Sequence, residues 1–378
     1  MWRITHSRNV HDRGSRIAID VGPVRAQPAG VGLYVALLAR ELMRAASLPL
    51  GLIGVRPEAR ALGELDPDLP RRPFSTPSYH SWMQLRAEAD AHSLDARLIH
   101  FTNAAAPLTG RIPYVLTVHD LSLARMPRTH PAARWGIIPV NLAAVARART
   151  VIVPSHWTAR ELEHIGVAGR RIVVIAHAPA LGAVAVNGSI VERLHLQPQR
   201  YILYFGTLEP RKNIARLVGA FERVNIDKPW LRLVLAGAPG WRFSGIEKRI
   251  AASPARERIV MPGYVDDADL ATLIAGSGAV AYVSLYEGFG MPVLDAMAVG
   301  AAVVTSRTTA MPEAAGGAAL LVDPTDEADI ARGLAEAIER RAELVALGHE
   351  RASARAWADV AAEHTEVYRY ALRALAAA

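Results

Sequence analysis

Residues 201–213 read YILYFGTLEPRKN, a run that passes from apolar residues through a small-residue turn to two adjacent cations. Tyr201–Phe205 predicts a buried β-strand, and a helix is expected to begin close to Lys212. The dipole at a helix start disfavours cations unless they meet an anion there. We therefore interpret Gly206, Thr207, Arg211 and Lys212 as a site for a diphosphate, with a solvated basic pair as the alternative.

The same alternation of short apolar runs and longer helical segments extends in both directions and predicts an α/β protein with parallel sheets. Because a chain of 378 residues is longer than a single domain usually is, two doubly wound domains are expected. The first half has strand-like runs at Arg16–Val21, Ala96–Phe101, Tyr114–Val118, Thr150–Pro154 and Arg171–Ile175. The second half has them at Tyr201–Phe205, Trp230–Ala236, Arg258–Met261, Ala279–Val283, Ala301–Thr305 and Ala319–Val322. A linker is expected within 178–199, where Asn187-Gly188 indicates a turn, and helices from about 326 to the end.

Composition excludes several classes of protein. The chain has no cysteine, so disulfides and thiolate metal sites are excluded. No run of about 18 uncharged apolar residues exists, and the first 16 residues lack the apolar core of a signal peptide, so we expect a cytoplasmic protein.

Positive charge is concentrated in the first half. Residues 1–190 hold 22 Arg and no Lys against 13 acidic residues, a balance of +9 within a total of +7. This distribution suits a phosphorylated acceptor or an anionic membrane, and arginines on solvated faces are the alternative. Arg134, Trp135, Ile137, Ile138, Arg147 and Arg149 could form an amphipathic membrane-facing surface, unless the apolar members pack in the core.

Two segments of the first half follow predicted strands. Gly30 and Gly32 lie between a strand and a helix, where glycine lets backbone N–H groups approach a phosphate, although a tight turn needs glycine too. His119, in TVHDL, follows the strand at 114–118 and could donate to a sugar hydroxyl, with Asp120 orienting loop amides or the ring. A structural histidine is the alternative.

In the second half, residues 286–295 read YEGFGMPVLD and follow the predicted strand 279–283. Glu287 precedes a glycine-rich turn and Asp295 lies about one turn inside the next helix, so both carboxylates can face a polyhydroxylated ligand. Asp295 could instead be a solvated helix residue.

At these residues the sequence resembles glycosyltransferase family 4, a group of retaining enzymes, and within it the bacterial mannosyltransferases of surface-polysaccharide synthesis. The resemblance covers nearly the whole chain and depends most on GTLEPRKN and YEGFGMPVLDAMA. It implies the GT-B fold: two Rossmann-like α/β/α domains that face each other across a cleft. The acceptor domain would be 1–185, the donor domain 186–355, and the helix at 356–378 would return to the first domain.

The resemblance also implies roles for single residues. Arg211 and Lys212 would hold the donor diphosphate, Glu287 would contact sugar hydroxyls, and His119 would lie beside the transferred sugar. Gly30 and Gly32 would close over the diphosphate. Asp295 would bind the ribose, although the family usually has Glu there. The remaining donor-binding positions would be Gly206, Thr207, Tyr264, Val265, Phe289, Gly290, Met291 and Pro292.

The expected donor is GDP-mannose, with UDP-sugars second, and the expected acceptor is a glycan or a lipid-linked glycan. No metal and no nucleic acid are expected. Asp267-Ala268-Asp269 looks like a metal-binding triplet, but we expect Asp266 or Asp267 to cap a helix.

Three other functions remain as alternatives: a sugar-nucleotide epimerase, a non-catalytic nucleotide-sugar or lipid-binding module, and an NAD-dependent dehydrogenase. The last is disfavoured because the sequence has no G-x-G-x-x-G followed by an acid at the required spacing.

Overall fold

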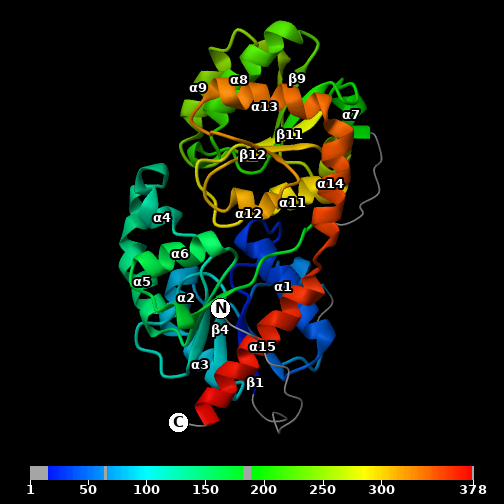
Figure 1. Cartoon of the computed structure of the whole chain (residues 1–378). Coiled ribbons are helices and arrows are strands. Elements are labelled where there is room, and N and C mark those ends of the chain that lie inside the picture. The colour runs from blue at the N-terminus through cyan, green and yellow to red at the C-terminus, as the bar shows by residue number, and fades with distance from the viewer. Residues whose placement is uncertain (1–15, 64–65, 182–188, 377–378) are drawn as a thin grey trace. The chain divides into compact units, whose positions relative to one another are not determined.

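The computed structural model of the chain describes residues 16–63, 66–181 and 189–376 (Figure 1). The chain forms two compact units. Unit 1 comprises the residues up to 125, residues 133–177 and the residues from 356 onward, and unit 2 comprises residues 126–132 and 178–355. The turn expected at Asn187-Gly188 lies outside the described residues.

Unit 1 is built on a parallel sheet in which seven described strands have the order β3-β2-β1-β4-β5-β6-β7. The five strands predicted for this half are confirmed, each to within about two residues. The strands are β1 (Arg16–Asp20), β2 (Leu50–Val55), β3 (Arg71–Pro73), β4 (Ala96–Phe101), β5 (Tyr114–Thr117), β6 (Thr150–Val153) and β7 (Ile172–Val174).

Strands β2 and β3 were not predicted. β2 contains Gly51 and Gly54, which weaken strand propensity. The glycines are needed for packing, because a Cβ on Gly51 would lie 2.9 Å from Leu94 and one on Gly54 would lie 2.9 Å from Trp82. β3 is a three-residue edge strand of arginine and proline, and nothing in its pattern distinguishes it from a loop.

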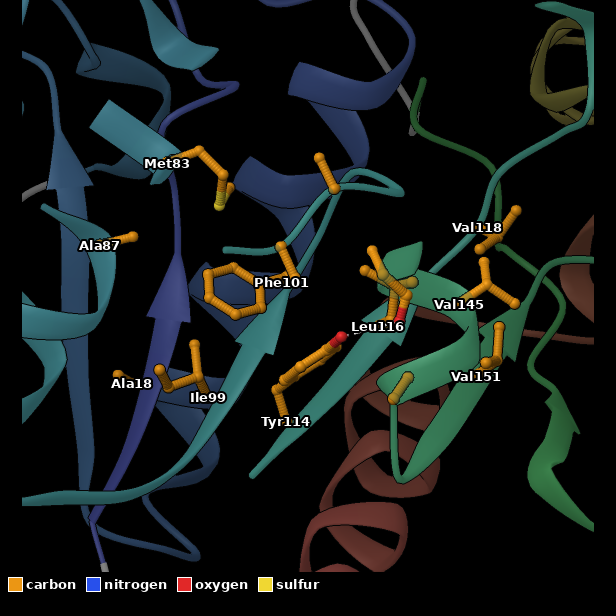
Figure 2. Packing of buried hydrophobic residues seen from close by; sticks show 14 of the residues in the cluster. Ala18, Met83, Ala87, Ile99, Phe101, Tyr114, Leu116, Val118, Val145 and Val151 are labelled. Carbon is orange, nitrogen blue, oxygen red and sulfur yellow. Dashed lines mark hydrogen bonds between the residues drawn. The ribbon is translucent and has the colours of Figure 1, made fainter. Parts of the chain in front are cut away.

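The helices of unit 1 are α1 (Val31–Ala45), α2 (Tyr79–Leu85), α3 (Ala87–His92), α4 (Ser122–Arg125), α5 (Ile138–Arg147), α6 (His156–His164) and α15 (Trp357–Ala376). Figure 2 shows Phe101 and Tyr114 side by side between the sheet and the helices. Their rings meet edge to face at 5.4 Å, and the Tyr114 hydroxyl donates to the carbonyl of Ala144 in α5. The buried aromatic residues therefore pack α5 onto the sheet without leaving a polar group unpaired.

The final helix, α15, packs against α1 in unit 1, as the fold prediction expected (Figure 1). His364 on α15 is fully buried, and its Nδ1 lies 2.7 Å from the carbonyl oxygen of Val360 one turn earlier. A carbonyl oxygen can only accept, so Nδ1 carries a proton and, in a neutral ring, Nε2 is an acceptor.

This proton assignment fixes a chain of hydrogen bonds that begins and ends on α15. The Tyr34 hydroxyl donates to His364 Nε2 at 2.9 Å, so the Tyr34 oxygen accepts from Thr117 at 3.2 Å. Thr117 in turn accepts from His100 Nε2 at 2.8 Å, and His100 Nδ1 accepts from Tyr368 at 2.7 Å. The chain ties α15 to α1, β4 and β5 through polar groups that water cannot reach.

Unit 2 has a six-stranded parallel sheet in the order β10-β9-β8-β11-β12-β13. All six strands predicted for this half are present: β8 (Tyr201–Phe205), β9 (Arg232–Ala236), β10 (Ile259–Gly263), β11 (Ala279–Tyr282), β12 (Val303–Ser306) and β13 (Leu320–Val322). Its helices are α7 (Ser189–Arg193), α8 (Ile214–Asp227), α9 (Phe243–Ala251), α10 (Asp267–Gly276), α11 (Met291–Val299), α12 (Met311–Ala315), α13 (Glu327–Glu339) and α14 (Arg341–Ser353). Asp266 caps α10 by accepting from the N–H of Asp269, as predicted.

Candidate active site

The candidate site forms where the strand order of unit 2 reverses. β8 and β11 are hydrogen-bonded neighbours, while the chain between them runs outward through β9 and β10. Ligands of open α/β sheets bind outside the carboxyl ends of the strands at such a point. The loop that follows β8 carries Arg211 and Lys212, and the loop that follows β11 carries Glu287, so the topology brings the three predicted residues to one edge.

Glu287 bridges the two cations. One carboxylate oxygen accepts from Arg211 at 2.9 Å and the other accepts from Lys212 at 2.6 Å. Burial by itself raises the pKa of Glu287, but the charges of Arg211 and Lys212 outweigh burial and lower it to about 2. The carboxylate is therefore ionised throughout the physiological range, and the three side chains form one charged cluster.

The arginine of this cluster is held by a second carboxylate, Glu209, which the sequence analysis missed as a site residue. Glu209 is only 2% exposed and accepts from Arg211 Nε at 3.2 Å and from Nη2 at 3.0 Å. Burial raises the pKa of Glu209, and Arg211 and Lys212 oppose this effect. Glu209 stands two residues before the arginine in the sequence, but nothing in the local pattern shows that its carboxylate is buried against the guanidinium.

Tyrosines support the lysine from the strands below. The Lys212 ammonium donates to the Tyr282 hydroxyl at 2.6 Å, and the Tyr282 ring stacks on Tyr204 at 5.9 Å. An ammonium has three N–H donors, and the two contacts with Tyr282 and Glu287 leave the third for a ligand. Both tyrosines lie in apolar strand runs, so the sequence pattern indicated only core residues.

A left-handed asparagine sets the direction of the basic residues. Asn213 has φ 63° and donates through Nδ2 to the carbonyls of Val283 and Pro324. These bonds fix the 3₁₀ turn Pro210–Lys212 over β11 and start α8 directly behind it. The side chains of the turn are consequently positioned before any ligand binds.

Backbone N–H groups lie in the same loop as Glu287. Gly290 has φ 115° and is the N-cap of α11, with Met291 and Pro292 in the first turn and Phe289 buried before it. A Cβ on Gly290 would lie 3.0 Å from Met311 Cε, so glycine is required by both conformation and space. The first N–H groups of a helix have no intrahelical acceptor and attract anions.

Gly206 and Thr207 open the loop after β8. Gly206 has φ 123°, and its carbonyl oxygen would lie 2.0 Å from a Cβ on Gly237, which shows how closely the two loops approach. The Thr207 carbonyl accepts from the Tyr204 hydroxyl at 3.0 Å. Tyr264 and Val265 follow β10, two strands away from β8 in the sheet, and Tyr264 is 57% exposed.

Asp295 takes no part in the charged cluster. Its Oδ1 accepts from the N–H groups of Ala180 and Leu181 at 2.6 and 2.9 Å. Burial raises its pKa to about 6, although the two backbone hydrogen bonds oppose this. It is 5% exposed, so the alternative of a solvated helix residue is wrong.

The predicted residues of unit 1 form a separate group. Gly30, with φ 51°, is the N-cap of α1, and a Cβ on Gly32 would lie 2.8 Å from the carbonyl oxygen of Pro23. The ring of Tyr34, one turn further along α1, meets His119 edge-on at 4.7 Å. The start of α1 and the loop after β5 therefore lie close together in unit 1.

The hydrogen-bond partner of His119 determines which ring nitrogen carries the proton. Its Nε2 lies 2.9 Å from the carbonyl of Thr102, so Nε2 carries a proton that is already donated. Burial lowers the pKa of His119, and the Thr102 contact and Asp120 oppose this. A neutral ring in this state offers a ligand the Nδ1 lone pair as an acceptor, while its one N–H, the donor that the sequence suggested, points to Thr102. Asp120 accepts from the N–H of Ser122 and so orients a loop amide, as proposed.

The described residues provide neither a cluster of metal ligands nor a helix that could span a membrane. No group of three histidine, aspartate or glutamate side chains in this part of the chain could hold a metal ion. None of the helices described is long and apolar enough to cross a bilayer.

In the predicted amphipathic surface, Arg147 donates to the carbonyls of Pro107, Leu108 and Gly110, whereas Trp135 is 43% exposed and does not belong to the core.

Comparison with known proteins agrees with this geometry. Residues 28–178 match the model of Glycosyltransferase Family 4, and residues 190–353 match that of Glycosyl transferases group 1. The chain is 32% identical over 219 residues to the O-antigen chain mannosyltransferase B of Escherichia coli, an alignment that covers 56% of this chain and 58% of the relative. It is 30% identical over 235 residues to the serotype-specific mannosyltransferase WbdA of Escherichia coli, covering 58% of this chain and 29% of the relative. The chain thus aligns with about half of the first relative and less of the second.

Solved structures share the fold at low sequence identity. Sucrose-phosphate synthase from Thermosynechococcus elongatus matches with a TM-score of 0.73 and 21% identity, covering 95% of this chain and all of that one. Alr3699/HepE of Anabaena, solved in complex with UDP and glucose, matches with a TM-score of 0.73 and 18% identity, covering 94% of this chain and all of that one. The sheets, the charged cluster and these matches lead to one assignment: the chain is a glycosyltransferase of the GT-B fold, with a family 4 domain at residues 28–178 and a group 1 domain at 190–353.

Proposed function

We propose that the chain is a retaining glycosyltransferase that moves mannose from GDP-mannose to a glycan or lipid-linked acceptor during the synthesis of a surface polysaccharide. The observation that carries the proposal is the cluster of Arg211, Lys212 and Glu287 at the reversal point of the unit 2 sheet. The names of the relatives, an O-antigen chain mannosyltransferase among them, favour mannose and a polysaccharide acceptor.

In this proposal the chain's own cations stabilise the leaving group. As the bond between the sugar C1 and the diphosphate breaks, negative charge grows on the phosphate oxygens. Arg211, the third N–H of Lys212 and the N–H groups at the start of α11 provide positive charge there without a metal. Glu287, ionised and rigidly held, keeps both cations in place and accepts hydrogen bonds from sugar hydroxyls.

Retention follows if the acceptor attacks the face from which the diphosphate leaves. The acceptor oxygen forms the new bond to C1, and its proton passes to the departing phosphate oxygen, so atoms and charge balance. His119 would contribute its Nδ1 acceptor to a hydroxyl of the transferred sugar, and Gly30 and Gly32 would lie against the diphosphate. Asp295, Tyr264 and Val265 would lie on the nucleoside side of the donor.

We further propose that the enzyme works in the cytoplasm against the inner face of the membrane. Trp135 and Leu142 are 43% and 44% exposed on one stretch of unit 1, with Arg134 and Arg149 also exposed. Apolar and cationic groups together suit an anionic lipid surface. Sedimentation with phosphatidylglycerol vesicles at low and high salt tests this proposal. If the pellet contains as much protein without vesicles as with them, the proposal is contradicted.

Product analysis tests the proposed reaction. Purified protein is incubated with GDP-mannose in EDTA, with and without a mannose-terminated oligosaccharide, and the products are identified by mass and by anomeric configuration. We expect α-linked mannose and GDP only when acceptor is present, and strong loss of product for Glu287→Gln. Isomerisation of the donor without acceptor would indicate an epimerase, and binding without any product would indicate a binding module.

One observation favours a second donor. The Alr3699/HepE structure holds UDP and glucose on the same fold, so UDP-glucose is the first alternative substrate to test. Transfer from UDP-glucose at a higher kcat/KM than from GDP-mannose would replace mannose in the proposal and leave the cluster's role intact.

A further inference from the structure

Asp295 lies at the fifth residue of α11, in the helix that the Glu287 loop leads into. Its Oδ1 accepts from two consecutive N–H groups, those of Ala180 and Leu181. These two residues belong to the segment 178–181, with which the chain enters unit 2 after leaving unit 1 at His177. One carboxylate oxygen therefore holds the start of unit 2 against the helix of the donor loop.

The contact is a buried, charge-assisted pair of hydrogen bonds. Asp295 is 5% exposed, Leu181 is 7% exposed and Ala178 is fully buried. A carboxylate that accepts two backbone N–H groups is fixed in one orientation, because each bond restricts the same oxygen. The two bonds consequently join the backbone of residues 180 and 181 directly to α11.

The second oxygen of the same carboxylate is differently placed. Oδ2 forms no hydrogen bond with any residue that the structure describes. It is also not one of the fully buried polar atoms that lack a partner, so part of its surface stays accessible. It keeps an acceptor for a hydroxyl group that approaches α11. An aspartate in which one oxygen holds the backbone and the other binds a ligand can couple ligand binding to the ordering of that backbone.

We propose that Asp295 is a positioning residue that couples donor binding to the segment 178–181. Oδ1 fixes the backbone of the segment, and a hydroxyl of the bound nucleotide on Oδ2 locks the side chain in the orientation that Oδ1 needs. The coupling rests on the proposed function, whereas the contact between Asp295 and the segment does not. A glutamate here would place the carboxylate one methylene further from the α11 backbone than Asp295 does.

The energetic sign of the coupling follows from reciprocity. If the ordered segment helps to orient Asp295 for the nucleotide, the bound nucleotide must stabilise the ordered segment by the same factor. The amide protons of Ala180 and Leu181 report that factor directly, because they exchange with solvent only when their bonds to Oδ1 open.

The experiment measures amide hydrogen exchange of Ala180 and Leu181 in the full chain, with no nucleotide and with saturating GDP or UDP. The variants are Asp295→Ala, which removes both oxygens, Asp295→Asn, which keeps a neutral acceptor, and Asp295→Glu, which keeps the charge on a longer side chain. Asp326→Ala serves as the control, since it removes the N-cap of α13 in unit 2 without touching the segment.

Without nucleotide, we expect Asp295→Ala and Asp295→Glu to raise the exchange rates of both amides at least about tenfold, with Asp295→Asn in between and Asp326→Ala unchanged. Saturating nucleotide should slow the same amides in the wild type and leave them unaffected in Asp295→Ala. Unchanged exchange in folded Asp295→Ala, confirmed by circular dichroism, would overturn the contact.

Two further outcomes separate this proposal from the proposed function. A wild type that binds GDP or UDP tightly while Ala180 and Leu181 exchange at the same rates as before would overturn the coupling and leave the glycosyltransferase proposal standing. A wild type that binds no nucleotide would overturn the proposed function and the coupling together, and the nucleotide-free comparison would still decide the contact.

Discussion

Replacing Tyr34 by phenylalanine removes a single hydroxyl group from the hydrogen-bonded chain that ties α15 into unit 1. The group has two partners: it donates to His364 Nε2 at 2.9 Å and accepts from Thr117 at 3.2 Å. Tyr34 is 1% exposed and His364 and Thr117 are fully buried, so water cannot replace the lost oxygen. The variant therefore takes one hydrogen bond away from a buried acceptor, His364, and one from a buried donor, Thr117.

The magnitude follows from those two groups. A buried polar group that loses its partner costs about 1–3 kcal/mol, so Tyr34→Phe should lower the free energy of unfolding by about 2–6 kcal/mol. Tyr201→Phe is the matched control, since Tyr201 is equally buried but makes one hydrogen bond, to the carbonyl of Leu273 at 2.6 Å. Its loss leaves one unpaired carbonyl, and we expect about 1–3 kcal/mol.

Urea unfolding followed by circular dichroism gives both values, and hydrogen exchange of α15 localises the effect. Tyr34→Phe should speed the exchange of α15 amides, and Tyr201→Phe should not. An equal or smaller loss for Tyr34→Phe, or unchanged exchange in α15, would refute the proton assignments from which the chain was built.

The same chain predicts a pH dependence. Burial, together with His364 and His119, lowers the pKa of His100 well below its usual value. The unfolded chain therefore takes up the His100 proton near pH 6.5 while the folded protein does not, so stability is present above that pH and is lost as the pH falls below it. His100→Gln should weaken this acid dependence in the same urea assay, and an unaltered slope between pH 7.5 and 5.5 would contradict it.

Three further predictions concern single residues, each read from urea unfolding. Gly237→Ala places a Cβ 2.0 Å from the carbonyl oxygen of Gly206 and should cost at least about 2–3 kcal/mol, whereas Gly245→Ala, with open space around it, should be neutral or stabilising. Burial raises the pKa of Asp20 to about 6, so the folded protein keeps this proton between pH 4 and 6 while the unfolded chain releases it near pH 4. As the pH rises from 4 to 6, the stability of the wild type should therefore fall by up to about 3 kcal/mol relative to that of Asp20→Asn. Asp266→Ala removes the cap of α10 and should cost about 1 kcal/mol at pH 7, and no loss would mean that the cap is replaced by water.

The strands of both units were predictable because buried parallel strands are short apolar runs separated by helical segments. All six strands of unit 2 and five of unit 1 followed from that pattern. β2 did not, because its glycines serve packing against Leu94 and Trp82, and such a contact is a tertiary fact that no local pattern contains. The final helix and its return to unit 1 came from the family resemblance and its helical periodicity.

The site was predictable as a set of residues but not as an arrangement. Arg211, Lys212 and Glu287 were identified, whereas their direct pairing and the second carboxylate, Glu209, were not. Sequence shows which charges stand at strand ends, but not whether neighbouring carboxylates bind the cations before a ligand does. Asp295 shows the same limit, since its partners Ala180 and Leu181 stand 115 and 114 residues earlier in the sequence.

The position of His119 after a predicted strand suggested a donor role, and the structure shows why the sequence could not decide its proton. The outcome depends on the carbonyl of Thr102, which lies at the end of another strand. A histidine has two nitrogens, and the partner of one fixes what the other can offer.

In the proposed function, Arg211 and Lys212, which Glu287 holds in place, bind a nucleoside diphosphate without a metal ion. Isothermal titration of GDP, UDP, ADP and dTDP in EDTA tests this, with the wild type compared with Lys212→Gln and with Lys228→Gln, a lysine of unit 2 outside the cluster. We predict that one nucleotide binds selectively, that Lys212→Gln weakens it about 10- to 100-fold through loss of a charge-assisted hydrogen bond, and that Lys228→Gln has no effect. Equal binding by the wild type and Lys212→Gln, or binding that appears only when Mg²⁺ or Mn²⁺ is restored, would show that these cations do not hold the diphosphate as proposed.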